Sequence, residues 1–209
     1  MKYLTSILIC GALLVLSALA LSAANPWSVR VRATYLQTAD QSDAFTALSI
    51  NFPKNAVSVN DKLIPEIDID YAFTDTIYGE VVLTIPQTQE VTLAGVGKLG
   101  TFKHLPPCFL FGYRFNPTGT FRPYVGAGFN YTLIWDNSLS VAGVPLHLDH
   151  HSIGFAAQAG VDWNLGNNWS VNVDLKHASL SSDVYAGSTR LTTAQLDPWL
   201  YAVGLRYDF

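Results

Sequence analysis

Apolar and polar side chains alternate with a period of two in eight segments of this 209-residue chain. Successive side chains of a β-strand point to opposite faces, so the alternation predicts strands with one apolar and one polar face. The eight segments are 27–36, 63–73, 77–85, 105–115, 121–135, 152–163, 169–179 and 198–209. Every charged residue inside them falls on the less apolar face.

Three further features distinguish a membrane barrel from a soluble sandwich. The apolar faces are aromatic near their ends, as membrane-interface girdles are, at Trp27, Tyr35, Phe73, Phe115, Trp135, Trp163 and Trp169. The polar faces carry glycine and charges of both signs. Long connections alternate with short ones such as 74–76 and 116–120, as outer loops alternate with periplasmic turns. The pattern predicts an all-β fold, an eight-stranded antiparallel transmembrane β-barrel over residues 25–209.

The N-terminal residues predict export. Lys2, the apolar run 7–21 and the small residues Ser22-Ala23-Ala24 have the form of a signal peptide, so we expect cleavage after Ala24. The mature chain would keep one cysteine, Cys108, and hence no internal disulfide. Charged residues make up only 13% of the chain and form no basic patch, so no nucleic-acid partner is expected.

The C-terminus predicts the assembly route. The chain ends on Phe209, with Tyr207 and three further apolar residues at alternate positions before it. This ending resembles the signal read by the outer-membrane assembly machinery. We therefore expect that machinery and outer-membrane lipid as partners, in the outer membrane of a Gram-negative bacterium.

Three stretches resemble one known family. They are His104-Leu105-Pro106-Pro107, then 121–128 with the sequence FRPYVGAG, then 197–201 with the sequence DPWLY. Together they resemble the OmpW family of outer-membrane proteins, which includes an alkane-uptake branch. The resemblance implies a porin-like eight-stranded barrel that transports small hydrophobic molecules. Cys108 departs from the pattern, because a small hydroxyl residue is expected after the two prolines.

The inward-facing residues divide by depth. The periplasmic half carries charges of both signs that should pair, because an unpaired buried charge is costly. We predict that they form a periplasmic plug, made of Arg30, Arg32, Asp68, Asp70, Glu80, Arg114, Arg122, Asp162, Asp174, Arg206 and Asp208. Stabilisation of the barrel alone is the simpler interpretation of the same charges.

The extracellular half of the lumen is predicted to be apolar. It would bind a small hydrophobic ligand through Leu36, Ile64, Val82, Pro106, Leu110, Ile134 and Leu200. Since the plug blocks the axis, the ligand would leave sideways into the membrane. Proline lacks the N–H that a strand ladder needs, so Pro106 and Pro107 predict a lateral opening, or merely the start of a strand.

Two other functions stay open on the sequence. His177 and Ser179 resemble the His-x-Ser pair of lipid A deacylases, but Leu180 stands where that family has asparagine, and no outward carboxylate completes a triad. A structural or adhesive barrel acting through its loops is the other. A possible metal cluster is formed by His147, Asp149, His150 and His151, but their spacing is not that of a metal site, so we expect neither metal nor cofactor. Because the His-x-Ser pair lacks its partner, we also expect no enzyme activity. Residues 91–100, with three glycines, fit a lid or a surface loop.

Overall fold

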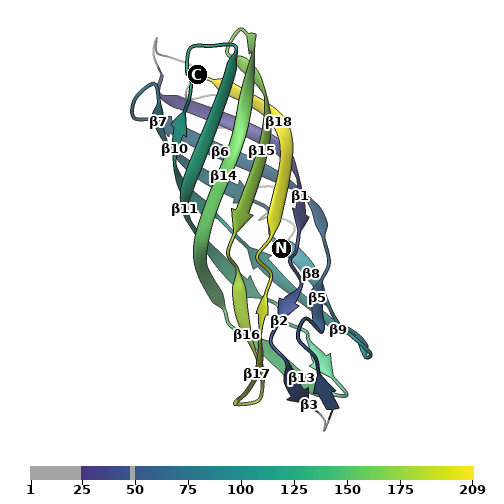
Figure 1. Cartoon of the computed structure of the whole chain (residues 1–209). Coiled ribbons are helices and arrows are strands. Elements are labelled where there is room, and N and C mark those ends of the chain that lie inside the picture. The colour runs from purple at the N-terminus through teal and green to yellow at the C-terminus, as the bar shows by residue number, and fades with distance from the viewer. Residues whose placement is uncertain (1–24, 48–49) are drawn as a thin grey trace.

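Eight antiparallel strands close into a barrel in the computed structural model, which describes residues 25–47 and 50–209. The hydrogen-bonded order is β10–β7–β6–β1–β18–β15–β14–β11, and pairing of β11 with β10 closes the ring (Figure 1). The strands are β1 (Trp27–Gln37), β6 (Lys62–Ala72), β7 (Ile77–Thr84), β10 (Cys108–Arg114), β11 (Phe121–Trp135), β14 (His151–Gly166), β15 (Trp169–Ala178) and β18 (Trp199–Asp208). The predicted fold class is confirmed. The predicted signal peptide, residues 1–24, lies outside the described residues and stays a prediction.

Closure satisfies the backbone in a medium without water. A spanning strand must place its N–H and C=O groups in a ladder, and a closed ring leaves no edge strand. Along residues 25–47 and 50–209 no helix is long and apolar enough to cross a membrane.

The two ends of the barrel differ, and we name them the turn end and the loop end. At the turn end, short connections join β6 to β7, β10 to β11 and β14 to β15 (Figure 1). Asn167 and Asn168 link β14 to β15 with φ values of 52° and 67°, the left-handed conformation that a two-residue hairpin turn requires. The C-terminus lies at this end, where the Phe209 N–H donates to the Trp27 carbonyl over 3.1 Å.

The connections at the loop end fold into further strands that extend the wall. These are β2 (Gln41–Ser42), β3 (Phe45–Ala47), β4 (Ile50–Phe52), β5 (Val57–Val59), β8 (Gln87–Leu93), β9 (Gly97–Leu105), β12 (Ser140–Val141), β13 (Val144–Leu148), β16 (Ser181–Ala186) and β17 (Thr189–Gln195). Residues 91–100 are therefore part of the β8–β9 hairpin, with an exposed turn at 94–96, and the two strands of the hairpin are paired. The turn uses Gly95 and Gly97, whose φ values of 77° and 102° suit glycine.

The predicted strand 105–115 is two strands. β9 ends at Leu105, β10 begins at Cys108, and Pro106 and Pro107 interrupt the ladder between them. β11 is long enough to pair with β10 and then with β9. The prolines therefore mark the level at which the barrel ends and the extension begins. The extension is the part of the wall that the additional loop-end strands form.

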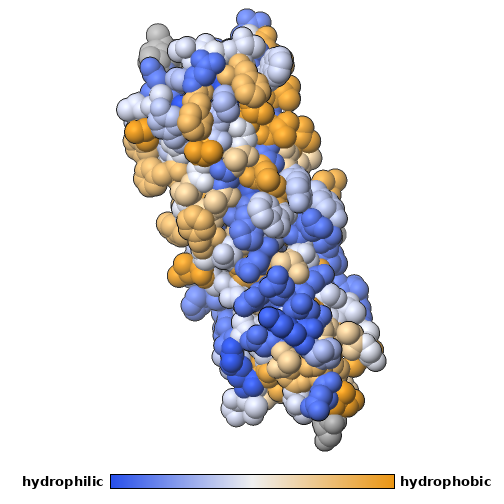
Figure 2. Space-filling view, viewed as in Figure 1, coloured by the Kyte–Doolittle hydropathy of each residue, from blue (hydrophilic) through white to orange (hydrophobic). Residues whose placement is uncertain are grey.

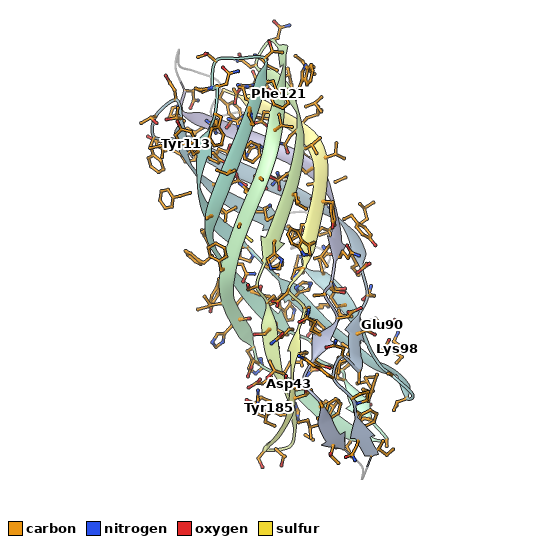
Figure 3. The ribbon with its side chains drawn as sticks, in the orientation of Figure 1. Asp43, Glu90, Lys98, Tyr113, Phe121 and Tyr185 are labelled. Atoms are coloured by element: carbon orange, nitrogen blue, oxygen red, sulfur yellow. The ribbon has the colours of Figure 1, made fainter. Side chains whose placement is uncertain are left out.

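The outer surface is apolar near the turn end and more polar toward the loop end (Figure 2). Outward residues such as Phe111, Val203 and Trp163 are more than half exposed, as lipid-facing residues of an isolated barrel must be. Tyr113 and Phe121 belong to the apolar surface at the turn end, whereas Glu90 and Lys98 lie on the extension (Figure 3).

Candidate functional site: an apolar passage above a charged network

Buried charges fill the barrel interior toward the turn end. Arg30 is fully buried and lies 2.9 Å from Asp70, 3.1 Å from Glu80 and 3.2 Å from Asp162. The charged network, as we name it, consists of Arg30, Arg32, Arg114, Lys176 and Arg206 with Glu66, Asp68, Asp70, Glu80, Asp162 and Asp174, all buried. Pairing of this density is what makes burial of so many charges tolerable.

Arg32 extends the network toward the loop end. Its guanidinium lies 2.7 Å from Glu66 and 3.5 Å from Asp174, and it also contacts Asp68. Arg32 further donates to the Asn172 side chain over 3.2 Å. The planar guanidinium can serve several carboxylates at once, which explains why arginine provides most of the cations here.

Two buried tyrosines fill the space between the arginines. The Tyr124 hydroxyl donates to Asp174 over 2.8 Å, and Arg30 lies over the Tyr124 ring at 4.8 Å from its centroid. Arg114 lies 4.3 Å from the Tyr78 centroid. Stacked guanidinium and aromatic groups are tightly packed, so this half of the barrel is a filled core.

The eleven residues of the predicted plug lie at two levels inside the barrel, and their role as a plug stays a prediction. Nine of its eleven members are buried in the charged network, but Arg122 and Asp208 lie half-buried at the turn-end mouth, 3.2 Å apart. The prediction omitted Glu66 and Lys176, which pair over 3.2 Å nearer the loop end. Both are inward by alternation, so the sequence pattern places them inside the barrel. The pattern does not give the height of each residue along the barrel axis.

An apolar chamber, the outer chamber, occupies the extension at the loop end. It holds about 40 Å³ of free space. Among the described residues, the lining is nearly all aliphatic or aromatic and has no Asp, Glu, Lys or Arg. Its apolar members include Phe45, Val57, Leu93, Phe102, Ile134, Leu146 and Leu196. Most belong to one buried apolar cluster. Phe45 and Ala47 are only partly buried, so the chamber borders the molecular surface beside β3.

A second cavity, the inner cavity, lies between the outer chamber and the charged network. It holds about 20 Å³. Its apolar lining includes Leu36, Ile64, Val82, Pro106 and Leu200, and its charged lining consists of Glu66 and Lys176. The Glu66–Lys176 pair is therefore a polar floor beneath an apolar space.

Two of the residues that the structure describes border both cavities, His104 on β9 and Leu180 just before β16. We name this level the neck. His104 is 1% exposed and Leu180 is 4% exposed, so both side chains are packed inside. Because each space accommodates only a few water-sized molecules, an organic ligand must displace side chains to pass the neck.

The inner cavity reaches a discontinuity in the barrel wall. Ladder pairing between β7 and β10 ends at Val82 opposite Cys108, and pairing between β8 and β9 begins at Gln87 opposite His104. Between these levels, 84–86 faces 105–107, and within the described chain no strand pairing joins the two segments. We name this place the wall gap. Thr84 and Pro106 border both the gap and the inner cavity.

The gap opens on one side of the prolines only. The Tyr131 N–H on β11 donates to the Pro107 carbonyl over 3.0 Å, so the β11 side is held. In an antiparallel ladder the N–H and C=O of one residue point to the same neighbour, and successive residues alternate. The missing N–H of Pro106 therefore faces β7, at the register position opposite Thr84.

The predicted ligand residues divide between these spaces. Leu36, Ile64, Val82, Pro106 and Leu200 line the inner cavity, and Ile134 lines the outer chamber. Leu110 is buried but pairs in register with Glu80 and borders neither cavity, so it lies below the apolar space. Their role in binding a ligand stays a prediction. Sequence reasoning assigned neither Leu180 nor the inward side of His104 to the lumen.

The alternative sites find less support in the geometry. The His177 ring stacks on Trp199 at 4.7 Å, its Nδ1 lies 3.2 Å from the Pro198 carbonyl, and no hydrogen bond to Ser179 occurs in the described part of the chain. A nucleophile and its base need such a bond. Over the same residues, no group of three or more His, Cys, Asp or Glu side chains is placed to hold a metal ion.

Comparisons with known proteins agree with the barrel. Residues 26–209 match the OmpW family. An uncharacterised outer-membrane protein, y4mB, of Sinorhizobium fredii is 38% identical, over 88% of this chain and 80% of that protein. The dibenzothiophene metabolism operon protein PahQ of Pseudomonas aeruginosa is 26% identical, over 88% of this chain and 89% of its own length. The crystal structure of OprG from Pseudomonas aeruginosa superposes with a TM-score of 0.74 at 24% identity, covering 88% of this chain and 95% of OprG.

Proposed function

This chain belongs to the OmpW family of bacterial outer-membrane barrels, and from that premise we propose that it carries small hydrophobic molecules into the outer membrane without catalysis. The observation that carries the proposal is the stack of outer chamber, neck and inner cavity, an apolar passage that ends on charge. Apolar surface attracts apolar solutes from water. The name of the PahQ relative, which refers to dibenzothiophene, is consistent with such a ligand class.

We place the loop end outside the cell and the turn end in the periplasm. The loop end has the longer connections, which face outward in barrels of this type. The extension is more polar on its surface than the barrel (Figure 2), so it would stand clear of the hydrocarbon layer and raise the outer chamber above it. A hydrophobic molecule would then bypass the polar headgroup region.

The charged network would act as the periplasmic plug. An apolar solute gains nothing from its densely paired charges, and Tyr78 and Tyr124 fill the space among them. An exit along the axis would require breaking many ion pairs together. The wall gap borders the inner cavity directly, so the proposed exit is lateral, past Thr84 and Pro106 into the membrane.

The assembly signal is a further part of the proposal. Tyr207 and Phe209 contact each other at 5.1 Å between ring centroids, and Tyr207 also packs against Trp169. These rings lie where the last strand meets the turn end. We expect the outer-membrane assembly machinery to engage them, and outer-membrane lipid to surround the apolar surface of the barrel.

The neck gives a test with two opposite signs. Liposomes with lipopolysaccharide in the outer leaflet would carry the refolded barrel, and uptake of radiolabelled n-octane and of a medium-chain fatty-acid ester would be followed. Leu180→Ala should accelerate uptake severalfold by widening the neck, and Leu180→Trp should slow it severalfold. Leu63→Trp, on a residue that is 73% exposed on the outer surface, is the matched control. Equal uptake by both Leu180 variants, or none above empty liposomes, would contradict the passage.

A further inference from the structure

Unpartnered polar atoms gather at the neck, although its surroundings are apolar. Three side chains there are His104, Thr132 and Asn130, each at most 1% exposed. Across the described part of the chain, His104 Nδ1, Thr132 Oγ1 and Asn130 Oδ1 have no hydrogen-bond partner, and neither has Oε1 of the buried Gln89, which lies beside His104. Buried polar atoms are normally paired, so four unpartnered atoms in one region call for an explanation.

The three residues lie on one stretch of the inner wall. On β9 and β11, His104 is opposite Ile134, and on β10 and β11, Cys108 is opposite Asn130. Thr132 lies between Asn130 and Ile134 on the inward face of β11. His104 and Thr132 line the outer chamber, whereas His104 and Asn130 line the inner cavity. The orphan atoms thus belong to the passage itself.

The hydrogen bonds that these residues do make fix the character of the free atoms. The Gln89 side-chain nitrogen lies 3.3 Å from His104 Nε2 and donates to it, so the neutral ring carries its proton on Nδ1. Asn130 Nδ2 donates to the Ser179 carbonyl over 3.2 Å, which leaves Oδ1 as an acceptor. The neck therefore presents one free donor, a free acceptor on Asn130, a second free acceptor on Gln89 behind the histidine, and a hydroxyl that can act as either.

We propose that the neck recognises an alcohol or phenol hydroxyl on an otherwise apolar ligand. The ligand hydroxyl oxygen accepts a hydrogen bond from His104 Nδ1. The same hydroxyl donates a hydrogen bond to Asn130 Oδ1 or to Thr132 Oγ1, while the hydrocarbon lies in the outer chamber. This inference rests on the proposed function and specifies its substrate class. A carboxylate fits less well, because Asn130 offers an acceptor, the described lining of the outer chamber has no cation, and Lys176 in the inner cavity is already paired with Glu66.

The test separates arrival of a ligand from recognition of its oxygen. The barrel in lipid nanodiscs would carry isoleucine methyl labels and ¹⁵N-histidine. Ile134 lines the outer chamber and reports any hydrocarbon that arrives, and His104 reports a bond at Nδ1. We expect n-octane to shift Ile134 only, and 1-octanol to shift both. The variant His104→Phe assigns the histidine signal.

Affinity provides the second measurement. The preference for 1-octanol over n-octane should be about fivefold, the ratio typical of one neutral hydrogen bond, and Thr132→Val or Asn130→Leu should reduce it. Thr88→Val, on the exposed face of β8, is the matched control. Far-UV circular dichroism and heat-dependent gel mobility would verify folding of each variant.

The outcomes are distinguishable. If both probes shift Ile134 alike and His104 stays unchanged, the neck holds only water and the hydroxyl inference is overturned, while the proposed passage stands. If neither probe reaches Ile134, both proposals fail. A shift of His104 by 1-octanol that Thr132→Val weakens and Thr88→Val preserves supports the inference.

Discussion

Lys176 on β15 lies 3.2 Å from Glu66 on β6, although β1 and β18 separate these strands in the sheet. Glu66 also pairs with Arg32, whose guanidinium lies 2.7 Å away, and Lys176 also lies 4.0 Å from Asp174. The pair therefore joins the floor of the inner cavity to the charged network. It is the first charge that an apolar molecule from the outer chamber would meet, in the same cavity that Thr84 and Pro106 of the wall gap border.

Removing the cation should destabilise the barrel. The charged network has six carboxylates and five cations, so Lys176→Met leaves six against four. Loss of one partner of a buried ion pair costs about 3–5 kcal/mol, and we expect the lower part of that range because Arg32 still contacts Glu66. Urea unfolding in detergent, followed by tryptophan fluorescence, measures the change.

The control is an exposed ion pair of similar chemistry. Lys98 lies 2.5 Å from Glu90, but their side chains are 56% and 45% exposed. Lys98→Met should cost at most about 1 kcal/mol, since solvent screens such pairs. Equal losses of unfolding free energy in the two variants would show that the Lys176–Glu66 pair contributes no more stability than an exposed ion pair.

The inward and outward faces were predictable because alternation is local. A period of two assigns each residue of a strand to a face without knowledge of its neighbours. Arg30, Asp70 and Asp162 could therefore be placed inside together. Their heights could not, because strand tilt and stagger decide which positions of different strands meet, and no single segment encodes them. Glu66, Lys176 and Leu110 were misplaced or omitted for this reason.

The extension was missed for a related cause. Its strands are short and are separated by turns, and β3 covers only Phe45–Ala47. Alternation over three residues is not distinguishable from chance. The neck depends further on register, since only the pairing of β8, β9 and β11 brings Gln89, His104 and Thr132 together. Sequence reasoning noticed His104 as part of a motif and found no chemistry for it.

Closing the wall gap should slow lateral exit. Pro106→Ala restores an N–H that points toward Thr84 on β7, so the ladder can continue past Val82. We expect a severalfold slower release of n-octane into liposome membranes and slower hydrogen exchange of the Thr84 amide. Pro107→Ala is the control, because its N–H would face β11, where pairing already exists. An unchanged release rate in Pro106→Ala would argue against an exit at this gap.

Close strand packing should make substitution by alanine costly at Gly128 and less costly at Gly126, two residues away. A Cβ on Gly128 would lie 2.0 Å from the Phe109 carbonyl oxygen, which is backbone and cannot yield. A Cβ on Gly126 would lie 3.1 Å from the Gln158 side chain, which can move. Gly128→Ala should therefore destabilise by about 1–3 kcal/mol, and Gly126→Ala by clearly less. Equal thermal unfolding temperatures for the two variants would contradict the packing.

The loop end should lose stability as the pH falls. Burial lowers the pKa of His104 to about 4 from its usual 6.5, and the positive charge of Lys62 lowers it further in the same direction. The unfolded extension then binds a proton more readily than the folded one, so stability is complete above about pH 6.5 and decreases down to about pH 4. The loss should approach about 3 kcal/mol, given 1.36 kcal/mol for each pKa unit. Hydrogen exchange of the β8–β9 amides across this range measures it, and His104→Gln should flatten the profile. A pH dependence that persists in His104→Gln would assign the effect to another group.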